Sequence, residues 1–230
     1  MKTITFYYDP ISPFAWLAFQ RLPEALMGDG NSTSLTHRVA YKPVLFAALL
    51  KHHGQLGPAE IPAKRDWTYR HVQWLGHSLG VPLAMPTAHP FNPLPLLRLA
   101  LACTTPQAPG ETNRYTTEQV LRHVWEGGAD ALAPERLAAL QATLAQHMAQ
   151  CGRTLADPGS EAVKQQLRAN TDEAIAAGAF GVPSFVVDGK LFWGVDGLPL
   201  LRACLQGDTW FDGPGWHGVA NVKVGVSRLG

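Results

Sequence analysis

The stretch DPISPFAWL, residues 9–17, places a serine where a strand pattern ends and a helix pattern begins. Residues 3–8 are rich in β-branched and aromatic side chains, which predicts a strand. Ser12 fits the N-cap of the following helix, because Pro13 then occupies the first helical position, where its missing N–H is no loss. The stretch therefore predicts a hydroxyl at a helix N-terminus.

The residues that follow complete a β-α-β unit. The helix beginning at Pro13 is predicted to run to about residue 27 and to stop at the glycine-rich residues 28–30. Residues 35–41 then predict a second strand, which lies parallel to the first because a helix crosses between the two.

A long helical block and a final β-β-α pattern make up most of the remainder. Residues 44–178 show apolar side chains at helical spacing, with proline and glycine in the loops. Residues 185–187 and 191–193 predict two short strands around Asp188-Gly189, a strong hairpin signal, and residues 198–205 predict a closing helix. This order predicts an α/β protein with a thioredoxin-like fold, β-α-β … β-β-α, interrupted by a large all-helical insertion.

These patterns divide the chain into three parts. Residues 1–43 and 179–206 are predicted to form the thioredoxin-like domain, residues 44–178 the helical insertion domain, and residues 207–230 a C-terminal tail. The aromatic-rich tail is longer than the fold needs, and it covers either the cleft or a dimer surface.

The sequence FGVPSF, residues 180–185, is expected to face the serine in such a fold. We expect the Val182–Pro183 peptide bond to be cis, which is rare enough to be a specified feature. The N–H and C=O of Val182 then point outward, where they can pair with the extended backbone of a tripeptide. The alternative is an ordinary trans proline that opens a strand.

The residue types at the helix N-terminus indicate a borrowed thiol. Dithiol members of this fold carry cysteines at the first position and three residues on, where this chain has Ser12 and Ala15. A helix N-terminus favours an anion, and a hydroxyl can donate one hydrogen bond to a thiolate. Lowering a thiol pKa from about 8.5 by two units takes roughly 2.7 kcal/mol, which these effects can supply together. We therefore expect Ser12 to hold the thiolate of glutathione; the alternative is that it only caps its helix.

Composition argues against several classes of partner. The 230 residues include 46% hydrophobic and 16% charged side chains, which is typical of a globular protein. Nineteen basic against eighteen acidic residues give a net charge of +1, so we expect neither a nucleic-acid nor a membrane partner. Because residues 1–9 lack a signal-peptide pattern and no apolar run approaches the roughly 20 residues that span a bilayer, we expect a cytoplasmic protein.

Cysteine and histidine add no site of their own. The three cysteines, at positions 103, 151 and 204, are too scattered for a disulfide framework or a metal site. Cys103 and Cys204 lie in apolar runs and are expected to be packing residues. His52 and His53 predict a solvated surface pair, so we expect no metal.

Several motifs occur in the same order as in one known family. The matching stretches are residues 7–17, YKPVL at 41–45, PAKR at 62–65, GVPL at 80–83, PFNPL at 90–94, GAFGVPSFVV at 178–187 and FWG at 192–194. Residues 1–206 thus resemble the 2-hydroxychromene-2-carboxylate isomerases, which belong with the kappa-class glutathione transferases in the thioredoxin-fold superfamily.

The resemblance implies an enzyme, a glutathione-dependent isomerase. In that family a glutathione thiolate adds reversibly to 2-hydroxychromene-2-carboxylate, or a related aromatic carboxylate, to give trans-o-hydroxybenzylidenepyruvate in aromatic hydrocarbon catabolism. Glutathione is thus the implied cofactor, a small aromatic carboxylate the implied substrate, and a homodimer the expected assembly.

The resemblance also implies a set of site residues. They are Ser12 as the catalytic thiolate holder, Val182, Pro183, Asp196, Gln55 and Lys64 for glutathione, and Phe14, Trp16, Lys42 and Trp67 for the substrate, with Arg65 and Trp74 as further candidates. For each cation the alternative is surface solvation, and for each aromatic side chain it is core packing.

Three positions depart from the family pattern. Gly197 stands where an arginine usually follows Asp196, so the α-carboxylate of glutathione loses its expected partner. One lost charge-assisted hydrogen bond costs about 1.5–3 kcal/mol, or about ten- to a hundredfold in affinity. Gln55 replaces the usual asparagine, and His71 replaces the usual aspartate.

Three classes of function are compatible with these residues, and they are ranked here from the most to the least favoured. The first is the glutathione-dependent isomerase, or a kappa-class-like transferase of another substrate. The second is a thiol-disulfide oxidoreductase, against which Ser12 and Ala15 argue directly. The third is a catalytically retired member that binds another small molecule or a protein, which Gly197 favours.

Overall fold

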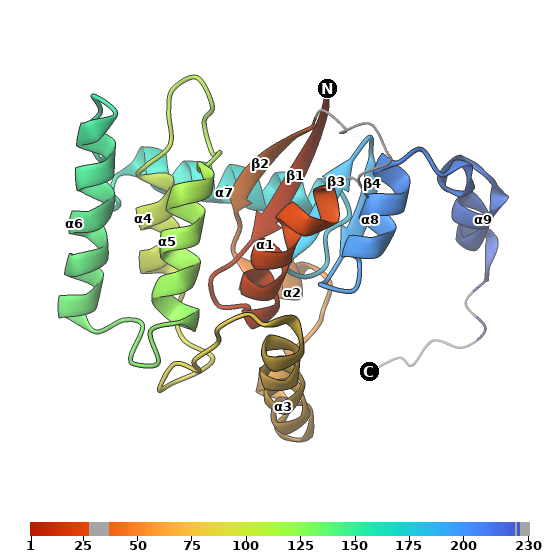
Figure 1. The fold of residues 1–230 in the computed structure, drawn as a ribbon, viewed down its shortest axis with the longest axis horizontal. Helices are drawn as coiled ribbons and strands as arrows, with labels where there is room; N and C mark the ends of the chain where they lie inside the picture. Colours follow the sequence, from red (N-terminus) through yellow and green to blue (C-terminus); the bar gives the residue numbers. More distant parts are fainter. Residues whose placement is uncertain (28–36, 224, 226–230) are drawn as a thin grey trace.

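A four-stranded mixed sheet forms the centre of the computed structural model, which describes residues 1–27, 37–223 and 225 (Figure 1). The strands are β1 (Lys2–Tyr8), β2 (His37–Pro43), β3 (Ser184–Val187) and β4 (Lys190–Trp193). Their order across the sheet is β2-β1-β3-β4, so the first strand along the chain lies inside the sheet. β2 runs parallel to β1, whereas β3 is antiparallel to both β1 and β4.

Side chains of β1 alternate between two buried faces of the sheet. Phe6 and Tyr8 point into the larger core, where Phe6 stacks on Phe185 of β3 with a centroid separation of 4.8 Å. Tyr7 points to the opposite face and joins a smaller core with Val44. Because both faces are covered, the end of β1 that leads to Ser12 is anchored from two sides.

Nine α-helices lie within the described residues. In chain order they are α1 (Pro13–Leu26), α2 (Phe46–His52), α3 (Pro62–Leu79), α4 (Leu94–Leu101), α5 (Arg114–Trp125), α6 (Pro134–Gln150), α7 (Glu161–Ala176), α8 (Leu198–Leu205) and α9 (Pro214–His217). Short 3₁₀ helices cover Pro58–Glu60, Thr209–Asp212 and Gly218–Asn221.

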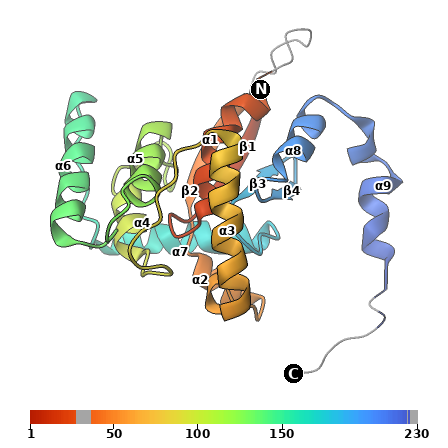
Figure 2. The same cartoon turned by 60° about the horizontal axis from the view of Figure 1, so that its bottom comes forward.

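The helices surround the sheet unequally. α1 and α8 lie on one face, and α7 crosses the other face behind them (Figure 1). α4, α5 and α6 form a separate layer beyond the β2 edge, while α3 projects below the end of the sheet where β1 and β2 finish (Figures 1 and 2). The end of β1 therefore meets α1, α2 and α3 in one region.

The described part of the tail packs against β4. Phe211 is buried and lies against Phe192 and Trp216, with centroid separations of 5.8 and 5.3 Å. Lys190 of β4 forms an ion pair with Asp212 at 3.0 Å. This part of the tail thus covers the β4 edge, beyond α8 (Figure 1).

The predicted order of strands and helices is confirmed. The predicted helix stop at residues 28–30 and the first two residues of the predicted strand 35–41 fall outside the described residues. The predicted domain boundaries stay predictions, and α7, which they assign to the insertion, packs on the sheet beside Tyr7.

Cys103 and Cys204 are buried free thiols, as expected. In the part of the chain that the structure describes, no helix has the length and apolarity to cross a membrane.

Candidate active site

Ser12 occupies the N-cap of α1, as predicted. Its backbone is extended (φ −92°, ψ 117°), and its Oγ accepts a hydrogen bond from the N–H of Ala15 at 3.3 Å. The same hydroxyl donates to the carbonyl of Val182 at 3.2 Å. The Ser12 side chain therefore caps α1 and also contacts the loop of residues 180–185.

The Val182–Pro183 peptide bond is cis, as expected. The Val182 carbonyl accepts from Ser12, and the Pro183 carbonyl accepts from the N–H of Gly194 at 3.0 Å. Val182 is buried, and within the described residues its N–H donates no backbone hydrogen bond. Two segments that are 170 residues apart in sequence thus meet at the N-terminus of α1.

Asp9 is a buried carboxyl near Ser12 that sequence reasoning missed. Its Oδ1 accepts the N–H of Ile11 at 3.0 Å, and its Oδ2 accepts the N–H of Phe46 at 2.9 Å. The side chain is fully buried, and this desolvation raises the pKa of Asp9 to about 7, although the two N–H donors oppose the shift. Its signal in the sequence was an acidic residue between the first predicted strand and Ser12.

Two further side chains hold the carbonyl groups of the same loop. The indole N–H of Trp125 donates to Pro10 at 2.9 Å, and Nε2 of His89 lies 2.8 Å from the carbonyl oxygen of Ile11. Because a carbonyl only accepts, Nε2 carries a proton. The hydroxyl of Tyr69 on α3 lies 2.8 Å from Nδ1 of His89, and burial lowers the pKa of this histidine. The serine loop is thereby joined to α3 and α5.

An exposed aromatic stack follows one face of α3. The ring of His71 stacks on Trp67 and on Trp74, with centroid separations of 6.2 and 6.5 Å. Phe14, in the first turn of α1, lies 6.0 Å from His71. The two indoles are 67% and 61% exposed. The structure therefore brings Phe14, Trp67 and Trp74 to one open surface next to the N-terminus of α1.

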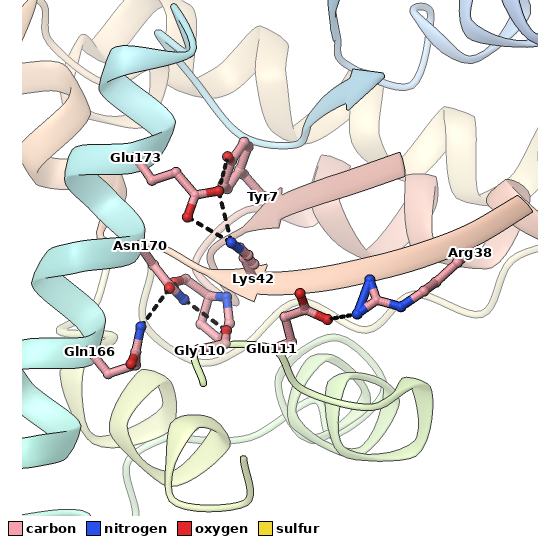
Figure 3. Close-up of polar contacts among 9 residues, drawn as sticks. Tyr7, Arg38, Lys42, Gly110, Glu111, Gln166, Asn170 and Glu173 are labelled. Carbon is pink, nitrogen blue, oxygen red and sulfur yellow. Dashed lines mark hydrogen bonds and ion pairs between the residues drawn. The ribbon is translucent and has the colours of Figure 1, made fainter. Parts of the chain in front are cut away.

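Lys42 has a partner within the fold. Its Nζ lies 2.8 and 2.6 Å from the two carboxylate oxygens of Glu173 on α7, and the Tyr7 hydroxyl donates to the same carboxylate at 2.7 Å. Figure 3 shows Glu173 contacting both side chains. Tyr7 and Lys42 are register partners, so both point to the α7 face of the sheet. This ion pair does not support the predicted contact of Lys42 with the substrate carboxylate.

The prediction that Trp16 lines the cleft is wrong. Its side chain is fully buried in the larger core, stacks on Phe19 with a centroid separation of 6.3 Å and donates its indole N–H to Pro82 at 2.9 Å. Residues two positions apart on a helix face different directions, so Phe14 and Trp16 do not share a surface.

The turn after β4 carries an acidic side chain and has no room for a basic one at its next position. Asp196 is exposed, and its contact with the glutathione ammonium group stays a prediction. Gly197 is buried, and a Cβ there would lie 2.5 Å from the carbonyl oxygen of Trp193. Because this neighbour is backbone, an arginine at position 197 would require the turn to move.

Gln55 and Lys64 are exposed, and their predicted contacts with glutathione stay predictions. The N–H of Gln55, just after α2, donates to the carbonyl of Leu50 at 2.9 Å. Lys64 lies in the first turn of α3. Arg65 differs, because its Nε donates to the carbonyl of Ala59 at 2.6 Å.

One family model spans this whole arrangement. The model of the DSBA-like thioredoxin domain matches residues 3–206, from β1 to the end of α8. The chain belongs to this family. A solved structure of 2-hydroxychromene-2-carboxylate isomerase shares the fold of this DSBA-like domain with a TM-score of 0.69, at 20% identity and covering 96% of this chain and 100% of the other.

Two relatives match the DSBA-like domain over nearly its whole length. Glutathione S-transferase kappa 1 of Rattus norvegicus is 27% identical over 217 residues, which cover 91% of this chain and 92% of the relative. The 2-hydroxychromene-2-carboxylate isomerase of Pseudomonas sp. (strain C18) is 25% identical over 207 residues, which cover 89% and 90% of the two chains. The resemblance inferred from the motifs is confirmed.

Proposed function

We propose that this protein is a glutathione-dependent enzyme that isomerises 2-hydroxychromene-2-carboxylate or a closely related aromatic carboxylate. One observation carries the proposal: the Ser12 hydroxyl, at the N-terminus of α1, lies 3.2 Å from the carbonyl of Val182 at the cis-proline bond. This geometry sets an anion-stabilising helix end against a backbone that can pair with a peptide. The name of the first relative supports glutathione as the thiol, and the name of the second supports isomerisation as the reaction.

The residues at this junction fit the thiol end of glutathione. Ser12 and the N–H groups in the first turn of α1 are donors for an anion, and the unpaired N–H of Val182 would donate to a peptide backbone. Asp196 would hold the ammonium group, and Gln55 and Lys64 would contact the rest of the tripeptide. When bound, glutathione supplies the nucleophilic thiolate.

Ser12 acts by donating a hydrogen bond. Its O–H now donates to the Val182 carbonyl, and rotation about the Cα–Cβ bond redirects it toward an anion held at the helix N-terminus. The released Val182 carbonyl is then able to accept from a ligand N–H. A hydrogen bond to a charged group contributes about 1.5–3 kcal/mol and a helix terminus about 0.3–2 kcal/mol, which together lower a thiol pKa by roughly two units.

The open surface on α3 supplies contacts for the substrate. Phe14, Trp67 and Trp74 present aromatic rings there, on or next to this helix. Aromatic pairs contribute about 0.5–1.5 kcal/mol each beyond the burial of their area. The planar ring of an aromatic substrate matches this surface.

The ultraviolet time course of 2-hydroxychromene-2-carboxylate isomerisation, with and without glutathione, tests the proposal. We expect acceleration only with glutathione, and a loss of about ten- to a hundredfold in rate for Ser12→Ala, because one hydrogen bond to a charged group is removed. Ser160→Ala is the matched control: Ser160 caps α7 in the same way, accepting the N–H of Val163 at 3.4 Å. A flat trace, or equal rates for the two variants, would contradict the proposal.

Gly197 favours a second candidate, a protein that binds the thiol but has lost turnover. The turn at Gly197 cannot hold the arginine of the family pattern without moving. Trp193 is 46% exposed and lies against Gly181, next to Val182, so its fluorescence is a natural reporter of glutathione binding. A fluorescence change that saturates with glutathione, without isomerisation, would favour this candidate.

A further inference from the structure

The carboxyl group of Asp9 is a buried titratable group that the proposed chemistry does not use. Among the described residues no ion pair reaches it, and its two oxygens accept N–H groups from two different segments, at Ile11 and at Phe46. A side chain that uses both oxygens in this way fixes the two segments relative to each other.

The segment that Asp9 joins to the serine loop is the start of α2. The N-cap residue of α2 makes no side-chain cap, so the N–H of Phe46 depends on Asp9 for its partner. The other end of α2 reaches the second half of the site, because Nε2 of His53 lies 3.1 Å from the carbonyl oxygen of Ala179, three residues before Val182. α2 therefore braces both segments that form the site.

We propose that Asp9 is a positioning residue for the candidate thiol site: its ionised carboxylate, by binding Ile11 and Phe46 at once, sets the Ser12 loop against α2. The proposal rests on the proposed function, because the site that Asp9 positions is the glutathione site. Gln55 lies three residues beyond the end of α2, and its N–H donates to the carbonyl of Leu50 within that helix, so this candidate glutathione contact is attached to the same element.

Protonation of Asp9 would weaken one of its two hydrogen bonds, to Ile11 or to Phe46. A carboxylate accepts with both oxygens, whereas a neutral carboxylic acid turns one of them into an O–H donor. That oxygen then accepts the N–H more weakly, so the hydrogen bond to one of the two segments is weakened. The charge of Asp9 thus sets how strongly both segments are held.

The groups that face Asp9 leave its charge unneutralised. The phenol of Tyr8 on β1 is buried near it, and the charge of Asp9 adds to the burial that raises the pKa of this phenol. His89 bonds to Ile11 from the loop before α4, and the first turns of α1 and α2 carry no charged side chain, with His53 at the far end of α2. Since burial raises the pKa of Asp9 to about 7, its charge changes in the neutral range.

Backbone amide NMR tests whether Asp9 binds both Ile11 and Phe46 in the wild-type protein. The amide proton resonances of Ile11 and Phe46 would be followed from about pH 5.5 to 8.5, a range that spans the ionisation of Asp9. We expect both to shift with one shared midpoint, because both N–H groups bind the same carboxyl. Separate midpoints, or no shift in either resonance, would overturn the proposal.

Asp9→Asn then tests the effect on the site, because it keeps the size and removes the charge. We expect its shared amide transition to vanish, the matching step in the pH profile of kcat/KM to disappear, and KM for glutathione to rise about tenfold above neutral pH. Asp157→Asn is the matched control: Asp157 accepts the N–H of Gly159 at 2.8 Å, also two residues on, but in an exposed loop. An Asp9→Asn pH profile that matches the wild type would overturn the proposal.

Failure of the proposed function and failure of the Asp9 proposal are distinguishable. If the wild-type protein neither binds glutathione nor accelerates the isomerisation, the proposed function fails. The shared midpoint of the Ile11 and Phe46 amides does not depend on any ligand, so it is decided separately.

Discussion

Backbone packing, not conformational freedom, accounts for glycine at position 197. Its φ of −74° is open to any residue, but a Cβ would lie 2.5 Å from the carbonyl oxygen of Trp193 and 3.0 Å from its nitrogen. An arginine introduced there would therefore displace the turn that carries Asp196, instead of simply restoring a charge.

We expect Gly197→Ala to lower the free energy of unfolding by about 1–3 kcal/mol, because backbone must shift to relieve this contact. Urea denaturation measures the change. Gly218→Ala is the control: Gly218 also has a negative φ, −67°, and nothing lies within 4 Å of its Cβ position, so the change should stay within about 0.5 kcal/mol. Equal stability losses in the two variants would contradict this account of the turn.

Asp9 predicts a pH dependence of stability with a definite sign. Burial raises its pKa from an ordinary 3.8 to about 7, so between these values the folded protein holds the proton more tightly than the unfolded chain does. The contribution of Asp9 to stability therefore falls as the pH rises from about 4 to about 7 and is constant above. The unfolding free energy of the wild type minus that of Asp9→Asn, from urea titrations, should follow this curve; a difference independent of pH would argue against it.

At the scale of elements, α3 presents a surface that its own packing does not require. The helix buries Val72 and Gly76, whereas Trp67, His71 and Trp74 stack on a separate exposed face. Their spacing of four and three residues is what aligns side chains on one face of a helix. Substitution of Trp67 or Trp74 should therefore weaken ligand binding with little effect on the free energy of unfolding.

We expect Trp67→Ala to raise KM for the aromatic substrate about two- to tenfold, the loss of one aromatic pair. The glutathione Kd should stay unchanged, and the free energy of unfolding should change by less than about 0.5 kcal/mol. Steady-state kinetics and urea denaturation check both. Trp210→Ala, a half-exposed indole on the tail, is the control. If the two variants raise KM equally, the α3 face is not the substrate surface.

Across the whole molecule, the features predicted correctly from the sequence are those that a short local stretch determines. Ser12 as an N-cap and the cis bond at Val182 both follow from short stretches, and the order of strands and helices places them together. The orientation of Trp16 and the ion pair of Lys42 were missed, because they depend on the packed face of α1 and on a partner from α7. Asp9 was missed for the same reason, since one of its two donors comes from α2.

The ionisation of bound glutathione, followed by the ultraviolet absorbance of its thiolate as the pH is varied, shows whether Ser12 stabilises a thiolate. With the wild-type protein the bound thiol should ionise roughly two pH units below the free thiol, and Ser12→Ala should reverse at least about one unit of that shift. Superimposable titration curves for the wild type, Ser12→Ala and free glutathione would contradict the claim that Ser12, at the N-terminus of α1, holds a thiolate.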